Sequence, residues 1–243
     1  MDVRSEFTIV VRSTDCTNYF PANTPGDFYV RLPHKIELTS DWCLTVSEIW
    51  ITKHWYNIHN SYVEICLGGD VYEKTGILSG YYHDNSRLVA ELNKIGENAS
   101  DGAVIFSYDA RNQRLYVGVR AGVKVKLSPS LCTMLGHDVG VPITGAWVSP
   151  LIMDVHRGDR LIYVHTDISR GQVFSDDILP IVKVVATDCY DFGSVIHDIN
   201  VGVQIPVDKK SFDVIHIEVR DSSNDIIKFE AGVTMVQLHF IRR

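Results

Sequence analysis

Ten histidines and thirty acidic residues make a metal centre the first chemistry to test in this chain. Two histidines and one carboxylate can hold iron in an oxygenase, and some β-sandwich folds carry such a site. His165 and Asp167 form an H-x-D pair on one face of a predicted strand, and His216 lies on a later predicted strand. A double-stranded β-helix metal oxygenase would use His165, Asp167 and His216 as its ligands.

The pattern around His165 argues against this triad. Ile162, Val164 and Ile168 form the more natural core face of the strand, which places His165 and Asp167 on the opposite, polar face. The sequence has no H-x-H pair of the cupin type, and the segment from His216 to Glu218 offers an equally good competing pair. We therefore predict solvated or loop-bonded side chains here, with no metal site and no cofactor.

Nucleophilic and phosphate-binding motifs are also missing from the sequence. There is no G-x-S-x-G elbow, and Gly68-Gly69-Asp70 lacks the following Gly-Lys-Ser/Thr of a phosphate loop, so it predicts a turn. The cysteines are odd in number, widely spaced and without a C-x-x-C pair, which predicts buried thiols rather than disulfides or a zinc site. They are Cys16, Cys43, Cys66, Cys132 and Cys189. We predict no catalytic residues and no enzymatic activity.

Aromatic residues are the remaining candidates for a binding site. They cluster in the segment 50–58, which contains Trp50 and Trp55, and at Tyr81 and Tyr82. Exposed aromatic rings beside polar side chains can stack on sugars, so a carbohydrate- or receptor-binding β-sandwich is an alternative function. For Trp50 and Trp55 we favour burial under a loop that closes one end of the sandwich, and we leave Tyr81 and Tyr82 undecided.

Composition limits the class of protein. The 243 residues are 45% hydrophobic and 22% charged, which is typical of an ordered globular chain. A net charge of −7 does not suit a surface that follows a phosphate backbone, so we predict no direct nucleic-acid binding. No apolar run approaches the roughly 20 residues that span a bilayer, and the first six residues do not resemble a secretory signal. We expect synthesis inside the cell, without secretion through a signal peptide.

Short alternating segments predict β-strands through most of the chain. Four precede the middle of the sequence and four follow it, at 7–11, 27–32, 42–51, 61–67, 160–168, 179–186, 212–220 and 232–241. The second should end at Pro33, and the third should place Trp42, Leu44, Val46 and Trp50 on one face.

The middle of the chain has a different pattern. Apolar residues at helical spacing predict a helix over 85–96 with Gly96 as its stop. Pro129 at the first helical position and Gly136 just past the end predict a second short helix over 128–136. A hairpin of 104–108 and 115–119 lies between them. We predict an all-β, eight-stranded single jelly-roll sandwich at 1–70 and 141–243, with a small α+β insertion at 71–140.

The order of several segments resembles one protein family across nearly the whole chain. The segments are FYVRL at 28–32, IEL at 36–38, the strand 42–50, WYNI at 55–58, GYY at 80–82, 88–93, LSPSL and its continuation at 127–136, LIYVHTDI at 161–168, FEAG at 229–232 and VQLHF at 236–240. This pattern is similar to the penton, or minor capsid, protein of Polinton/Maverick elements and adintovirus-like viruses. His165 stands where we expect an aromatic residue in relatives.

The resemblance implies a structural role. Members of this family are single jelly-roll proteins that assemble as homopentamers and close the five-fold vertices of an icosahedral capsid. The implied partners are other copies of the chain and a double jelly-roll major capsid protein, with a host receptor as an additional candidate. The implied location is the vertex of the virion, with no membrane span and no catalytic residues to transfer. A five-fold ring needs two different complementary sides on each subunit.

Overall fold

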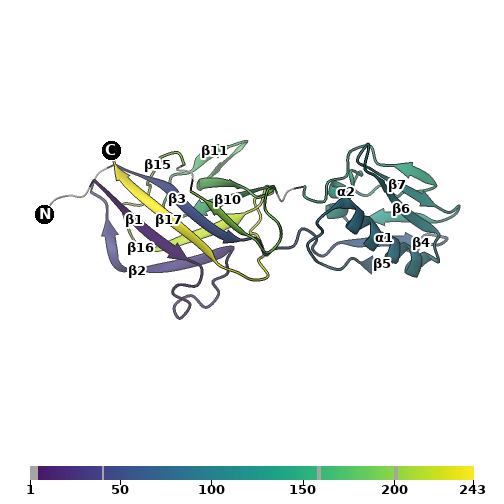
Figure 1. The fold of residues 1–243 in the computed structure, drawn as a ribbon, viewed down its shortest axis with the longest axis horizontal. Helices are drawn as coiled ribbons and strands as arrows, with labels where there is room; N and C mark the ends of the chain where they lie inside the picture. The colour runs from purple at the N-terminus through teal and green to yellow at the C-terminus, as the bar shows by residue number, and fades with distance from the viewer. Residues whose placement is uncertain (1–4, 40, 158–159, 200–201) are drawn as a thin grey trace. The chain divides into compact units, whose positions relative to one another are not determined.

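The computed structural model describes residues 5–39, 41–157, 160–199 and 202–243. It divides into two compact units, the first made of Met1–Trp55 with Gly158–Arg243 and the second of Tyr56–Arg157. Figure 1 shows that the first unit is a sandwich of strands and that the second combines strands with two helices. The second unit contains the predicted insertion 71–140 and extends beyond it at both ends.

The first unit has two main antiparallel sheets. One has the order β1-β17-β3-β14, with the short strand β15 also paired to β3. The other has the order β13-β10-β16-β2, and a separate hairpin is formed by β11 and β12. The strands of the first sheet are β1 (Glu6–Arg12), β17 (Thr234–Arg242), β3 (Trp42–Thr52), β14 (Val195–Asp198) and β15 (Ile205–Pro206). The remaining strands are β13 (Ile181–Ala186), β10 (Leu161–Thr166), β16 (Ser211–Arg220), β2 (Asp27–Glu37), β11 (Gln172–Phe174) and β12 (Asp177–Leu179).

The pairing of these strands is that of a jelly roll. In chain order the eight main strands are β1, β2, β3, β10, β13, β14, β16 and β17. The first pairs with the last, the second with the seventh, the third with the sixth and the fourth with the fifth. A long hairpin rolled into two four-stranded sheets has this arrangement, so the predicted fold class is confirmed.

Alternating side chains from both sheets fill the space between them. In β17 the even positions from Thr234 to Phe240 are fully buried, and in β16 Ile215, Ile217 and Val219 are buried as well. The apolar side chains among them belong to one hydrophobic cluster that includes residues of both sheets. Because successive strand residues point to opposite faces, this alternation leaves the odd positions of β17 and the even positions of β16 on the outer surfaces.

The predicted segments 61–67 and 179–186 do not form single strands of the sandwich. The segment 61–67 does not join the jelly roll, because it forms β4 in the second unit, and the eighth strand is instead β14. β14 has only four residues, which is too short for its hydrophobic alternation to identify a strand from the sequence. It is defined by its pairing with residues 49–52 of β3. The predicted strand 179–186 is divided at Pro180 between β12 and β13.

The second strand continues through Pro33 to Glu37 instead of ending there. Proline cannot donate a backbone hydrogen bond, but β2 lies at the edge of its sheet, where the lost donor is tolerated. The register also shifts at this point, since Val214 of β16 faces Arg31 while Phe212 faces Ile36. The predicted end at Pro33 is wrong because a proline interrupts a central strand, whereas an edge strand can continue through it.

A β-bulge in β3 changes the expected faces of that strand. Gln237 of β17 pairs with Glu48 and Leu238 pairs with Val46, so Ser47 has no partner opposite it. One extra residue reverses the alternation, and Ile49 therefore joins the core. The predicted face of Trp42, Leu44 and Val46 is correct up to the bulge, but Trp50 lies on the outer side.

The second unit has a core of its own. Three-stranded sheets are formed by β5-β4-β8 and by β6-β7-β9, and helix α1 packs against β6. Their bounds are β4 (Tyr62–Cys66), β5 (Glu73–Gly76), β8 (Lys124–Leu127), β6 (Val104–Asp109), β7 (Arg114–Val119), β9 (Ala146–Val148), α1 (Asn85–Ser100) and α2 (Pro129–Leu135). Both helices and the hairpin of β6 and β7 occur where they were predicted. No helix in the described ranges combines the length and apolarity needed to cross a bilayer.

Helix α1 begins at the predicted residue, Asn85, but ends later than predicted. Asp84 caps its N-terminus, with a carboxylate oxygen accepting a hydrogen bond from the backbone N–H of Arg87 at 2.9 Å. Gly96 does not stop the helix, which continues to Ser100. A Cβ atom at Gly96 would lie 2.5 Å from the carbonyl oxygen of Val104, so this glycine permits close packing between α1 and β6.

Candidate functional surfaces of the sandwich

The outer face of the β13-β10-β16-β2 sheet collects the histidines and carboxylates considered as metal ligands. The register of β16 with β2 places Tyr29 opposite His216 and Asp27 opposite Glu218. On the other side of β16, His165 of β10 lies opposite Glu218. Just beyond the end of β10, Asp167 accepts a hydrogen bond from the backbone N–H of His216 at 2.9 Å. The sheet therefore gathers side chains that are far apart in the sequence.

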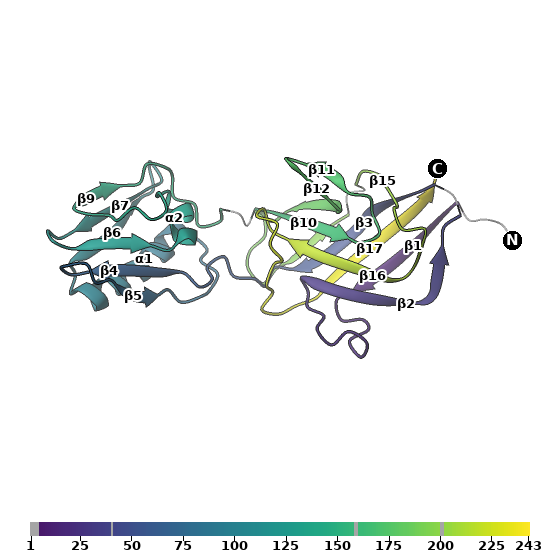
Figure 2. The same ribbon diagram turned by 180° about the vertical axis from the view of Figure 1, so that it is seen from behind.

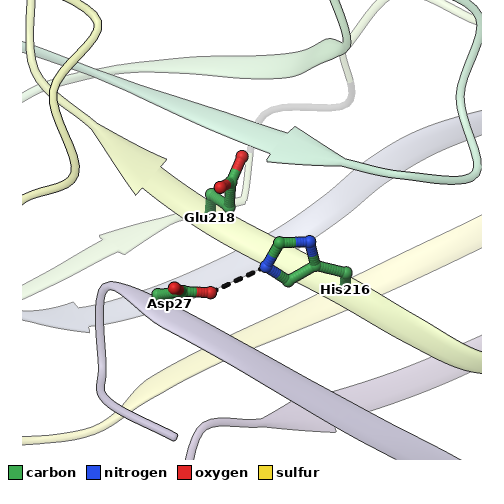
Figure 3. Close-up of side chains that lie close together, drawn as sticks. All are labelled: Asp27, His216 and Glu218. Carbon is green, nitrogen blue, oxygen red and sulfur yellow. Dashed lines mark hydrogen bonds and ion pairs between the residues drawn. The ribbon is translucent and has the colours of Figure 1, made fainter.

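The side chains whose ligand atoms converge differ from the triad of His165, Asp167 and His216 that the oxygenase alternative would use. Asp27, His216 and Glu218 have potential ligand atoms within 4.8 Å of one another. Figure 3 shows Asp27 and His216 facing each other from neighbouring strands, with Nε2 of the histidine 2.7 Å from a carboxylate oxygen. Asp167 instead pairs with Lys209.

Existing contacts occupy the groups of this cluster. The ring of Tyr29 stacks on the ring of His216 with centroids 3.9 Å apart. The guanidinium of Arg220 contacts both oxygens of Glu218, at 2.8 and 3.2 Å. Burial by itself would raise the pKa of Glu218, but the hydrogen bonds and charge of Arg220 outweigh it and lower that pKa. A cation bound here would have to compete with the guanidinium, so the geometry fits an ion-pair network that fixes the strand register.

His165 is buried rather than solvated, contrary to the prediction. Its side chain lies on the outer face of β10, yet the residue is only 3% exposed, and Nε2 has no hydrogen-bond partner among the described residues. On the same face Tyr163 packs edge-on against Phe174 of β11, so the hairpin covers this part of the sheet. Burial, and secondarily the charge of Arg220, lowers the pKa of His165 to about 4.

The aromatic residues do not form a single platform. Trp55 is buried as predicted and contacts Phe229 edge-on. Trp50 is 40% exposed, which contradicts its predicted burial; its indole N–H donates to Glu48 at 2.7 Å. Tyr81 and Tyr82 belong to the second unit, where the Tyr82 hydroxyl donates to the Leu78 carbonyl oxygen at 2.9 Å. The residues that the carbohydrate-binding alternative would use are thus divided between the two units.

The cysteines follow the prediction only in part. All five are free thiols, and Cys43, Cys66 and Cys132 are buried. Cys16 is half-buried and Cys189 is exposed, since both lie in connections outside the strands. Burial raises the pKa of Cys132, which is the opposite of what an activated nucleophile requires.

One edge of the sandwich carries an apolar groove that the sequence pattern did not reveal. β13 and β14 are edge strands, and a buried ion pair between Lys183 and Asp198, 3.0 Å apart, joins them. Beside this pair lies a groove of about 470 Å³. It is lined by the β11 strand, 181–184 of β13 and segments near β15, including Val173, Val184 and Val203.

The opposite edge carries a folded loop. β1 and β2 are the edge strands on that side, and the residues between them form the connection that we call the β1–β2 loop (13–26). Figures 1 and 2 both show this loop and the β11–β12 hairpin on opposite sides of the sandwich. Sheet order therefore gives the unit two different edges, as a head-to-tail assembly requires.

Comparison with known proteins gives a similarity in structure only. No protein-family model and no curated protein sequence matches the chain. The crystal structure of the SeMet-labelled mavirus penton protein aligns over 98% of this chain and 99% of its own, with a TM-score of 0.51 and 10% identity. The D2–D3 domains of the flagellar cap protein FliD from Escherichia coli align with a TM-score of only 0.24 and 13% identity, over 97% and 98% of the two chains. The first alignment supports the jelly-roll fold, and the second is too weak to support an argument.

Proposed function

We propose that this protein is a minor capsid protein, or penton, that forms homopentamers and closes the five-fold vertices of an icosahedral shell. The observation that carries the proposal is the end-to-end structural alignment with the mavirus penton protein, which spans both units of the chain. The sequence resemblance to penton proteins of Polinton/Maverick elements and adintovirus-like viruses points in the same direction.

In this role the structure acts by geometry rather than by chemistry. The buried core of the sandwich provides a rigid subunit, and its two different edges provide surfaces for head-to-tail contacts. Each contact can be modest, because closing a ring adds several contacts at once. No catalytic step is part of the proposal, since Asp27 and His216 are hydrogen-bonded to each other and Glu218 is paired with Arg220.

The proposal includes the partners and the location of the protein. Its partners are other copies of the chain and a double jelly-roll major capsid protein, and a host receptor is a further partner compatible with exposure at a vertex. Its location is the virion. The second unit, which is inserted between β3 and β10, is the part of the chain most suited to vary without changing the jelly roll.

The mass of the purified protein in solution tests this proposal. Light scattering over a range of protein and salt concentrations should show a species of five chains of 27.4 kDa each. The same sample should be assayed for bound metal. In a separate experiment, the protein should be co-expressed with the major capsid protein, and it should then occupy the vertices of the assembled shells. A monomer that carries stoichiometric iron and does not enter shells would contradict the capsid role and support an oxygenase.

A further inference from the structure

We propose that the apolar groove beside β13 receives the β1–β2 loop of a second copy of this chain. This inference rests on the proposed homo-oligomeric function and names the surfaces that would form each contact. It concerns only the first unit, in which both the groove and the loop lie.

The groove has the surface of an interface. Val173 is 82% exposed, Val203 is 79% exposed and Ile178 is also largely exposed, although all three are apolar. Val173 and Val203 line the groove, and Ile178 lies on the strand paired with β11. Exposed apolar side chains that gather around a concave site are typical of a surface that a protein partner covers.

The loop on the opposite edge is already folded for contact. The side-chain amide of Asn23 donates to the Tyr29 carbonyl oxygen at 2.8 Å, and its oxygen accepts from the Tyr29 N–H at 2.9 Å. The ring of Phe20 also packs against that of Tyr29. These contacts fix the conformation of the loop, in which the side chain of Tyr19 is 66% exposed. A preorganised loop that presents an exposed tyrosine loses little conformational entropy on binding.

Charges beside the two surfaces are complementary. Asp176 and Asp177 are exposed at the turn of the β11–β12 hairpin, next to the groove, and neither forms an ion pair within the described ranges. On the opposite edge the guanidinium of exposed Arg31 lies 5.3 Å from the ring centroid of Tyr19, and Arg31 likewise has no ion-pair partner among the described residues. Arg31 can pair with the acidic turn while the ring of Tyr19 enters the apolar groove. This complementarity within one chain favours a second copy as the occupant of the groove.

The placement of the two surfaces decides the kind of assembly. The loop connects the edge strands β1 and β2, whereas the groove lies at the edge strands β13 and β14. A contact between them joins different surfaces of successive subunits, and such a heterologous contact can close into a ring.

Sedimentation velocity of full-length variants tests the contact. Val203→Asp places a charge in the groove, and Arg31→Glu reverses the charge beside Tyr19; each should weaken self-association about tenfold or more. Val71→Asp is the matched control, because Val71 is a valine of similar exposure, 83%, in the second unit. It should leave association unchanged. Circular dichroism should confirm that every variant is folded.

A charge-reversal rescue distinguishes a direct contact from a loss of folding. Asp176→Lys/Asp177→Lys should weaken association alone, and combining it with Arg31→Glu in the same chain should restore most of the wild-type affinity. If Val203→Asp weakens association but the combined charge reversal does not restore it, the β1–β2 loop is not the occupant of the groove. Pentamers that no groove or loop variant affects would overturn the inference while leaving the proposed function intact. A wild-type chain that stays monomeric at millimolar concentration would also overturn it, and co-assembly with the major capsid protein would then decide the capsid role separately.

Discussion

The buried imidazole of His165 should make the sandwich less stable as the pH falls. Burial lowers the pKa of His165 to about 4 in the folded protein, whereas an unfolded chain has a histidine pKa near 6.5. Between these values the unfolded state binds more protons than the folded state. Stability is therefore complete above about pH 6.5 and is lost as the pH falls towards 4.

The size of the stability loss follows from the difference between the folded and unfolded pKa of His165. A difference of about 2.5 pKa units corresponds to about 3 kcal/mol in the free energy of unfolding once both states are protonated. Between pH 7 and pH 4.5 the expected loss is about 2 kcal/mol. The pKa of Glu218 is lowered in the folded protein by its pairing with Arg220, so its contribution begins to be lost near the ordinary glutamate value of 4.5, at the lower limit of this range.

His165→Phe should remove this loss, because it replaces the imidazole with an aromatic ring that does not titrate. Urea unfolding at several pH values would be followed by tryptophan fluorescence in a Trp147→Phe background, so that the remaining indoles all report on the first unit. His34→Gln, which removes an exposed histidine, is the control and should keep the wild-type slope. Parallel pH profiles for wild type and His165→Phe would refute the reasoning.

Three further predictions concern the Lys183–Asp198 ion pair, the close contact at Gly96 and the hydrogen bonds of the β1–β2 loop. Asp198→Ala removes the carboxylate that lies 3.0 Å from the buried ammonium of Lys183 and should cost about 3 to 5 kcal/mol in urea unfolding. Lys183→Met/Asp198→Leu should stay within about 1 kcal/mol of wild type, and equal losses for the two variants would contradict the ion pair. Gly96→Ala should destabilise the second unit by about 1 to 3 kcal/mol, because its Cβ would lie 2.5 Å from a backbone oxygen. Unfolding followed by Trp147 fluorescence measures the loss. Gly118→Ala, where the nearest atom to the added Cβ is 4.0 Å away, is the control and should cause a smaller loss of stability. Asn23→Ala should speed amide hydrogen exchange in the β1–β2 loop by removing three hydrogen bonds, and unchanged exchange would show that they do not hold the loop.

Several features of this protein could be predicted from the sequence because they depend on local pattern. The alternation in β16 and β17 identifies their core faces, and that pattern depends only on the two-residue period of a strand. Helix α2 was predicted from Pro129 at its start and Gly136 at its end, and Gly136 has the positive φ of 70° that ends such a helix. Local chemistry determines these elements, so neighbouring residues are sufficient to identify them.

Other features depend on which strands pair, and only the tertiary structure decided them. The bulge at Ser47 exists because β17 pairs across it, and it places Trp50 outside and Ile49 inside. Strand β14 is recognisable only beside β3.

The polar cluster and the groove have the same origin. Asp27 and His216 meet through the register of β2 with β16, and His165 is buried on a face that its own strand pattern predicts to be polar. The edge that carries the groove is defined by the order of strands in two sheets. Long-range pairing brings together residues whose separation along the chain hides their contact, whereas local periodicity specifies each strand by itself.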